Sequence, residues 1–169
     1  MQVNEKDVED EWLMIDVEQE ETKNTDVKEP NKNNDRKNVA PDSPFRVSKK
    51  IPRKSLKAKG NDAFRSLKFK KAIELYSLAL ETGEDDGKGI HILYSNRSNA
   101  YYKAKMYDLA LVDAEKTVAL APAFAKGYHR IAVVKIAMGK NDEAKAAYKS
   151  AIKIEPNNQA YKQLLKDLM

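Results

Sequence analysis

Five polar residues in this sequence have the chemistry of an anion-binding site. Lys and Arg side chains donate charge-assisted hydrogen bonds to carboxylates, and Asn amides add neutral donors. Asn is also a poor helix former, which is seldom found in the middle of a helix without a function. The five residues are Lys57, Asn61, Asn96, Lys126 and Arg130. If they converge, they predict a site for a small dicarboxylate, such as a C-terminal Asp with its two carboxylates.

An internal repeat determines where these residues lie. Tyr94 and Tyr128 are 34 residues apart, and Pro122 and Pro156 have the same spacing. The pattern recurs one unit earlier if four additional residues are allowed in the loop 84–90. Such a period is typical of helical hairpins that stack on one another, each unit burying the apolar face of its neighbour.

The sequence therefore predicts an all-α fold of three helical hairpins. The expected units are 53–86, 91–124 and 125–158, with helices at 53–66, 69–82, 91–104, 107–120, 125–138 and 141–154. A capping helix should follow at 159–169, with an apolar stripe of Ala160, Leu164, Leu165 and Leu168. The five polar residues fall on the first helices of the hairpins, within an arc of roughly 100°, so they should face the same side.

The repeat resembles the tetratricopeptide repeat, an α-solenoid family with small residues where the two helices meet and Pro after the second helix. The polar residues resemble the dicarboxylate clamp of co-chaperones similar to the heat-shock organising protein. Three segments carry this likeness: Leu56–Asn61, Leu93–Ser98 and Lys126–Arg130. The resemblance covers residues 53–158 and implies an adaptor that binds the terminal Glu-Glu-Val-Asp of cytosolic heat shock protein 90, heat shock protein 70 or both.

The same resemblance implies that different clamp residues bind different parts of the peptide. Lys57, Asn61 and Asn96 would hold the main-chain carboxylate of the peptide. Lys126 and Arg130 would bind the Asp side chain and the nearby peptide backbone.

Other candidate residues carry weaker signals. Tyr101 and His129 are candidates for lining the peptide groove. Neither His91 nor His129 has a second His, a Cys or paired carboxylates at ligand spacing, so we expect no metal, cofactor or catalytic residue. The sequence also lacks a phosphate-binding loop and a nucleophile elbow. We therefore expect a binding protein rather than an enzyme.

Residues 1–52 differ in composition from the repeats. They are polar, contain four Pro residues and show no apolar periodicity, which predicts a disordered arm. Trp12, Leu13 and Ile15 form an apolar island in this arm, either a chance cluster or a short motif that folds on a partner such as a client or docks on the repeats. The run 49–54 is basic; a solvated linker is favoured over a nuclear address or a phosphate-binding patch.

Charge and composition leave two alternatives to the chaperone hypothesis. Residues 1–42 carry a net charge of −7 and residues 43–169 a net charge of +12. A basic repeat domain could bind another acidic C-terminus as a scaffold, or, less favoured, nucleic acid. The absence of Cys, of a secretion signal and of a long apolar run predicts a cytoplasmic protein without a membrane partner.

Overall fold

The computed structural model describes residues 51–82 and 89–169. The predicted disordered arm, its candidate motif Trp12, Leu13 and Ile15, and residues 83–88 lie outside the described residues.

Seven helices and no strand make up the described segments, so the predicted all-α fold is confirmed. The helices are α2 (Arg53–Arg65), α3 (Phe69–Thr82), α4 (Ile90–Lys103), α5 (Tyr107–Leu120), α6 (Ala125–Ala137), α7 (Asn141–Ile154) and α8 (Gln159–Asp167). Each of the six repeat helices begins and ends within one residue of the predicted bounds. None of the helices in these segments is long and apolar enough to cross a membrane.

Small residues allow the two helices of each pair to approach closely. Ala72, Ala110 and Ala144, one in the second helix of each pair, are completely buried. Gly60 in α2 lies so close to Tyr76 in α3 that a Cβ atom there would be 2.5 Å from the tyrosine Cε1. The ring of Tyr76 is therefore packed directly against the backbone of α2.

The turns inside the three hairpins share one backbone conformation. Leu67, Lys105 and Gly139 each have a positive φ, of 58°, 61° and 74°. In each turn the backbone N–H of this residue and that of the next residue donate to carbonyls at the end of the first helix, for example Lys105 N to Tyr102 O at 2.9 Å. Only the third turn has Gly, the residue that adopts this conformation without strain.

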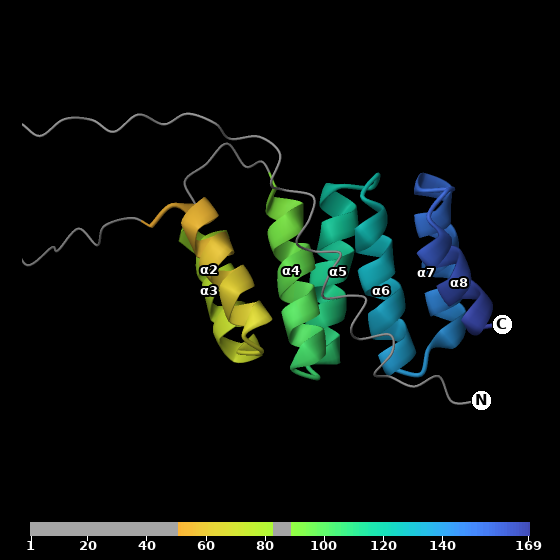
Figure 1. The fold of residues 1–169 in the computed structure, drawn as a ribbon, viewed down its shortest axis with the longest axis horizontal. Coiled ribbons are helices and arrows are strands. Elements are labelled where there is room, and N and C mark those ends of the chain that lie inside the picture. Colours follow the sequence, from red (N-terminus) through yellow and green to blue (C-terminus); the bar gives the residue numbers. More distant parts are fainter. Residues whose placement is uncertain (1–50, 83–88) are drawn as a thin grey trace, which may run out of the picture. The chain divides into compact units, whose positions relative to one another are not determined.

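The first helices of the three pairs form one layer, because α2 contacts α4 and α4 contacts α6. The second helices α3 and α5 each contact two successive first helices. Figure 1 shows this for α5, which lies between α4 and α6. This arrangement brings the first helices, which carry all five predicted site residues, side by side.

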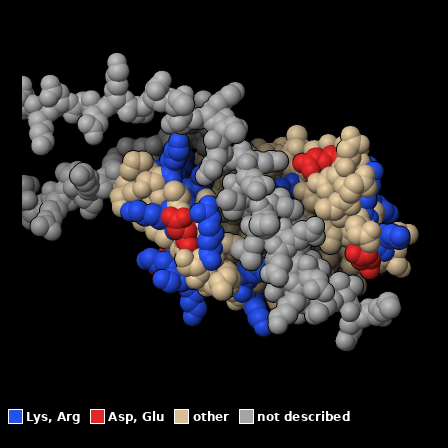
Figure 2. Space-filling model, in the orientation of Figure 1, with Lys and Arg blue, Asp and Glu red and all other residues tan. Residues whose placement is uncertain are grey.

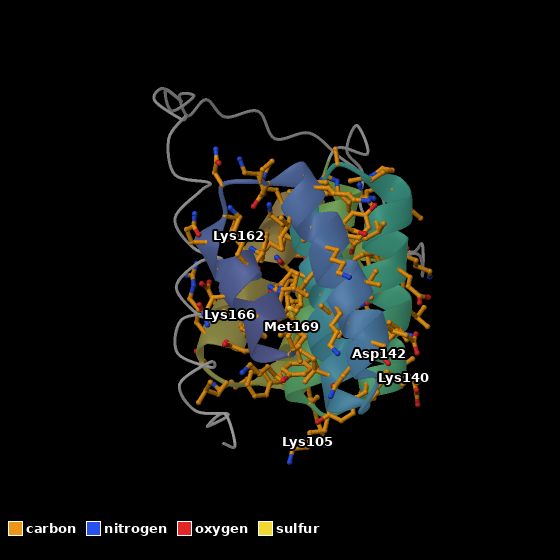
Figure 3. All side chains as sticks on the ribbon, turned by 90° about the vertical axis from the view of Figure 1, so that its right-hand side faces the viewer. Lys105, Lys140, Asp142, Lys162, Lys166 and Met169 are labelled. Carbon is orange, nitrogen blue, oxygen red and sulfur yellow. The ribbon has the colours of Figure 1, made fainter. Side chains whose placement is uncertain are left out.

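Helix α8 covers the third hairpin. Asn158 caps its first turn, accepting a hydrogen bond from the backbone N–H of Tyr161 at 3.2 Å. Tyr161, Leu164, Leu165 and Leu168 pack against the core of the third pair. Three residues of the predicted stripe pack there together with Tyr161, which was not predicted, and Ala160 is half-buried. Lys162 and Lys166 lie on the exposed side of α8 (Figure 3).

Candidate functional site

Two of the predicted site residues are joined by a hydrogen-bond network between α2, α3 and α4. Asn96 Nδ2 in α4 donates to Asn61 Oδ1 in α2 at 3.2 Å. The hydroxyl of Tyr76 in α3 donates to the same oxygen at 2.7 Å. Asn61 and Asn96 are both half-buried. The structure thus brings the two amides into direct contact, although they are 35 residues apart in the sequence.

Lys57 lies on α2, four residues before Asn61, so it is one helical turn away on the same side of the helix. Its side chain is half-buried. It adds a positive charge on the side of α2 that carries the hydrogen-bonded amides. This part of the face combines one ammonium group with two amides.

Lys126 and Arg130 supply the cations of α6. Burial, helped by the neighbouring charge of Arg130 and opposed by Glu155, lowers the pKa of Lys126 to about 8. Burial also lowers the pKa of Arg130 to about 10, and only 4% of this residue is exposed. Many Lys and Arg side chains are at the surface, as Figure 2 shows over the α2–α3 end, so the nearly complete burial of Arg130 is unusual. The depressed pKa values of both cations mean that an added carboxylate would relieve an electrostatic cost.

The charge of Arg130 also reaches the amide network of the first hairpin. Burial raises the pKa of Tyr76, while the positive charges of Arg65 and Arg130 act in the opposite direction. Arg130 on α6 is therefore near the phenol that donates to Asn61 on α2. The first and third hairpins contribute to the same polar region, and α4 lies between them.

The face as a whole is rich in hydrogen-bond donors. Its cations can only donate, and the Asn61 carbonyl oxygen already accepts two hydrogen bonds. Groups of this kind bind carboxylate oxygens, which can only accept when they are ionised. The arrangement fits recognition of an anionic group by a surface that three hairpins share.

His129 and Tyr101 occupy different environments from each other. His129 is only 1% exposed, and its ring stacks on Tyr161 with centroids 5.6 Å apart. This burial differs from the groove-lining position that we predicted. Burial and the charges of Arg130 and Lys126 hold the pKa of His129 well below its usual range, so the ring is neutral at physiological pH. Tyr101 is half-buried, with its ring 5.6 Å from the guanidinium of Arg97.

Sequence reasoning missed a buried ion pair beside the amide network. Arg97, next to Asn96 on α4, forms two hydrogen bonds with Asp113 on α5, at 2.6 and 2.9 Å. Arg97 also donates to Ser77 Oγ on α3 at 2.8 Å. These contacts tie α4 to both second helices that flank it and so fix the position of Asn96. The sequence signal that could have revealed this ion pair is Asp113, an acidic residue on the inner side of the helix predicted at 107–120.

Sequence reasoning also missed Tyr76 as part of the amide network. The signal was its hydroxyl group, since a buried phenol usually needs a hydrogen-bond partner. Among the described residues, no group of three or more His, Asp and Glu side chains is arranged to hold a metal ion.

Several known proteins are similar to this chain. Residues 125–158 match the family model described as a tetratricopeptide repeat. The chain is 39% identical over 107 residues to heat shock protein STI1 of Saccharomyces cerevisiae, an alignment that covers 63% of this chain. The chain spans only 18% of the length of that relative.

Two similar solved structures contain bound peptides. One is described as the first TPR of Spaghetti (RPAP3) bound to the HSP90 peptide SRMEEVD, with a TM-score of 0.63, 30% identity, and coverage of 69% of this chain and 89% of that one. The other is the second TPR domain of human RPAP3 in complex with the HSP70 peptide SGPTIEEVD. Its TM-score is 0.61 and its identity 27%, and the match covers 68% of this chain and 92% of that one.

Proposed function

This chain belongs to the tetratricopeptide-repeat family, and we propose that it is a co-chaperone adaptor that binds the C-terminal Glu-Glu-Val-Asp tail of heat shock protein 90, heat shock protein 70 or both. Support comes from the two similar structures, which hold peptides ending in this sequence. On this proposal the described residues bind rather than catalyse, and the chain acts in the cytoplasm, where these tails are found.

Two cations on α6, half-buried Lys126 and buried Arg130, are the observation that carries the proposal. Lys126 and Arg130 have lowered pKa values because they are removed from water. Evolution of a stable fold alone would favour apolar residues at such positions. A carboxylate ligand explains them, because it compensates both charges when it binds.

We assign the two carboxylates of a terminal Asp to the two ends of the face. Lys57, Asn61 and Asn96 bind the main-chain carboxylate through one charged and two amide donors. Lys126 and Arg130 bind the side-chain carboxylate. Two groups of donors suit a residue with two carboxylates, and the free chain end supplies one of them.

Calorimetric titration with the peptide Met-Glu-Glu-Val-Asp tests this function. We expect a dissociation constant in the low micromolar range, or about −8 kcal/mol. The same peptide with an amidated C-terminus should bind at least about tenfold more weakly, because it lacks one charge and one acceptor oxygen.

Variants locate the site. Lys126→Ala and Arg130→Ala should each lower the affinity by at least about tenfold, the usual cost of losing a charged hydrogen bond. Lys140→Ala is the matched control, because Lys140 is exposed in the turn before α7 (Figure 3) and should leave binding unchanged. A folded, helical protein that gives no heat with the free-acid peptide would contradict the chaperone proposal. A library of other acidic C-termini would then test the scaffold alternative.

A further inference from the structure

We infer that Tyr76 is a positioning residue of the peptide site: its hydroxyl fixes the Asn61 amide with its NH₂ group toward the ligand, so that the site selects a free terminal carboxylate over a carboxamide. This inference rests on the proposed function and adds to it a residue that does not itself touch the peptide.

The hydrogen bonds at Asn61 determine which way its amide faces. The carbonyl oxygen Oδ1 accepts from the Tyr76 hydroxyl at 2.7 Å and from Asn96 Nδ2 at 3.2 Å. Two donors occupy both lone pairs of that oxygen. The NH₂ group must point in the opposite direction, where it donates to none of the described residues and remains available to a ligand.

Tyr76 is well suited to hold this orientation. The residue is 2% exposed, and its ring lies against the backbone of Gly60, the residue before Asn61. The hydroxyl therefore has little freedom to move away from the amide. Burial raises the pKa of Tyr76, so the phenol keeps its proton and continues to donate.

The opposite orientation of the amide would change the chemistry of the site. With the amide turned over, the carbonyl oxygen of Asn61 would face the ligand, and the Asn61 NH₂ would have to donate to the Tyr76 hydroxyl and to a turned Asn96 amide. The buried proton of Tyr76 would then lose the acceptor that Asn61 Oδ1 provides. A carbonyl oxygen repels a carboxylate but accepts a hydrogen bond from the NH₂ of a carboxamide. Tyr76 thus disfavours the orientation that would tolerate an amidated chain end.

The third hairpin provides an internal comparison. Tyr148 occupies the same repeat position as Tyr76 and is also fully buried. Its hydroxyl has no hydrogen-bond partner among the described residues. A tyrosine hydroxyl at this position is therefore not required for packing the hairpin, whereas that of Tyr76 has a specific acceptor.

The test compares Tyr76→Phe with the wild-type chain, using the free-acid and the amidated Met-Glu-Glu-Val-Asp peptides. The ring and its packing on Gly60 are retained in this variant. We expect affinity for the free acid to fall about fivefold, the equivalent of one hydrogen bond, while affinity for the amidated peptide stays the same or rises. Tyr148→Phe, the matched control, should leave the preference for the free acid unchanged.

A double-mutant cycle keeps the test decisive if Tyr76→Phe also lowers stability. If Tyr76 acts through Asn61, Tyr76→Phe should have no further effect on peptide affinity in an Asn61→Ala background. Equal losses in both backgrounds, or an unchanged preference for the free acid in Tyr76→Phe, would overturn the inference. Failure of the wild-type chain to bind the free-acid peptide would instead overturn the proposed function, so the two failures are distinguishable.

Discussion

Lys126 should make peptide affinity fall as the pH rises above 8. Its pKa is lowered to about 8, chiefly by burial, from the ordinary value near 10.5. A bound carboxylate favours the charged ammonium and raises this pKa again, so binding at high pH requires uptake of a proton. Below about pH 7 the proton is already present, and affinity should be independent of pH until the peptide carboxylates themselves become protonated.

The size of the effect follows from the pKa of the free protein. With a pKa of about 8, roughly nine tenths of Lys126 is charged at pH 7 and roughly one tenth at pH 9. If the neutral amine contributes little to binding, affinity should decrease about tenfold between these two values. Two neighbours do not obscure this change: His129 is neutral throughout, and the pKa of Arg130 is about 10.

Calorimetry at constant ionic strength is a suitable assay, with an N-acetylated peptide so that no peptide amine titrates. Lys126→Arg is the control, since its guanidinium stays charged and its affinity should change far less between pH 7 and 9. Equal wild-type affinities at pH 7 and 9 would refute the reasoning. The same decline in Lys126→Arg would show that another group titrates.

Three further predictions concern stability, measured by urea denaturation of the peptide-free chain. Lys126→Met should raise the free energy of unfolding at pH 7 by up to about 3 kcal/mol, because the partly buried charge of Lys126 destabilises the fold below its pKa of about 8. This gain in stability should disappear as the pH rises toward 10.5, where the lysine of the unfolded chain also loses its proton. A loss of stability in Lys126→Met would contradict the prediction. Lys105→Gly should stabilise the folded chain by about 1 kcal/mol, because it removes the backbone strain of a non-glycine residue at φ 61°. Gly139→Ala should destabilise the folded chain by a similar amount, because it introduces that strain. Stabilities equal to that of the wild-type chain would argue against strain in these turns. Asp113→Ala should cost about 3–5 kcal/mol, since it leaves Arg97 charged and buried without its carboxylate; a change below 1 kcal/mol would show that water replaces the carboxylate.

The helices were predictable from the sequence because the repeat supplies related boundary signals in its units, although only the second and third units have a Pro after the second helix. Tyr94 and Tyr128 set the period, and Pro122 and Pro156 mark where the second helices end. The spacing of residues along a helix then shows which polar residues share one side of it. The five candidate residues could be proposed from the sequence, because choosing them requires only the helix on which a residue lies and the side that it faces.

Details that depend on how helices pack could not be predicted. The hydrogen bond from Tyr76 to Asn61 joins two helices, and its existence depends on their separation at Gly60. The burial of Tyr161, whose ring stacks on His129, likewise depends on how α8 packs on the third hairpin. The left-handed turn at Lys105 has no sequence signal, because Lys rarely adopts that conformation.

The layer formed by α2, α4 and α6 has a consequence for cooperativity. In a stack of repeats each unit contacts only its neighbours, so the end units can open while the rest stays folded. The five candidate residues come from all three hairpins, and such a site exists only while every hairpin is in place. A bound peptide would add a link between the first and third units that neighbour contacts alone do not supply. Its binding energy would oppose the partial opening of any one hairpin, because opening would destroy the site. With the peptide bound, the three hairpins would therefore unfold together rather than one at a time.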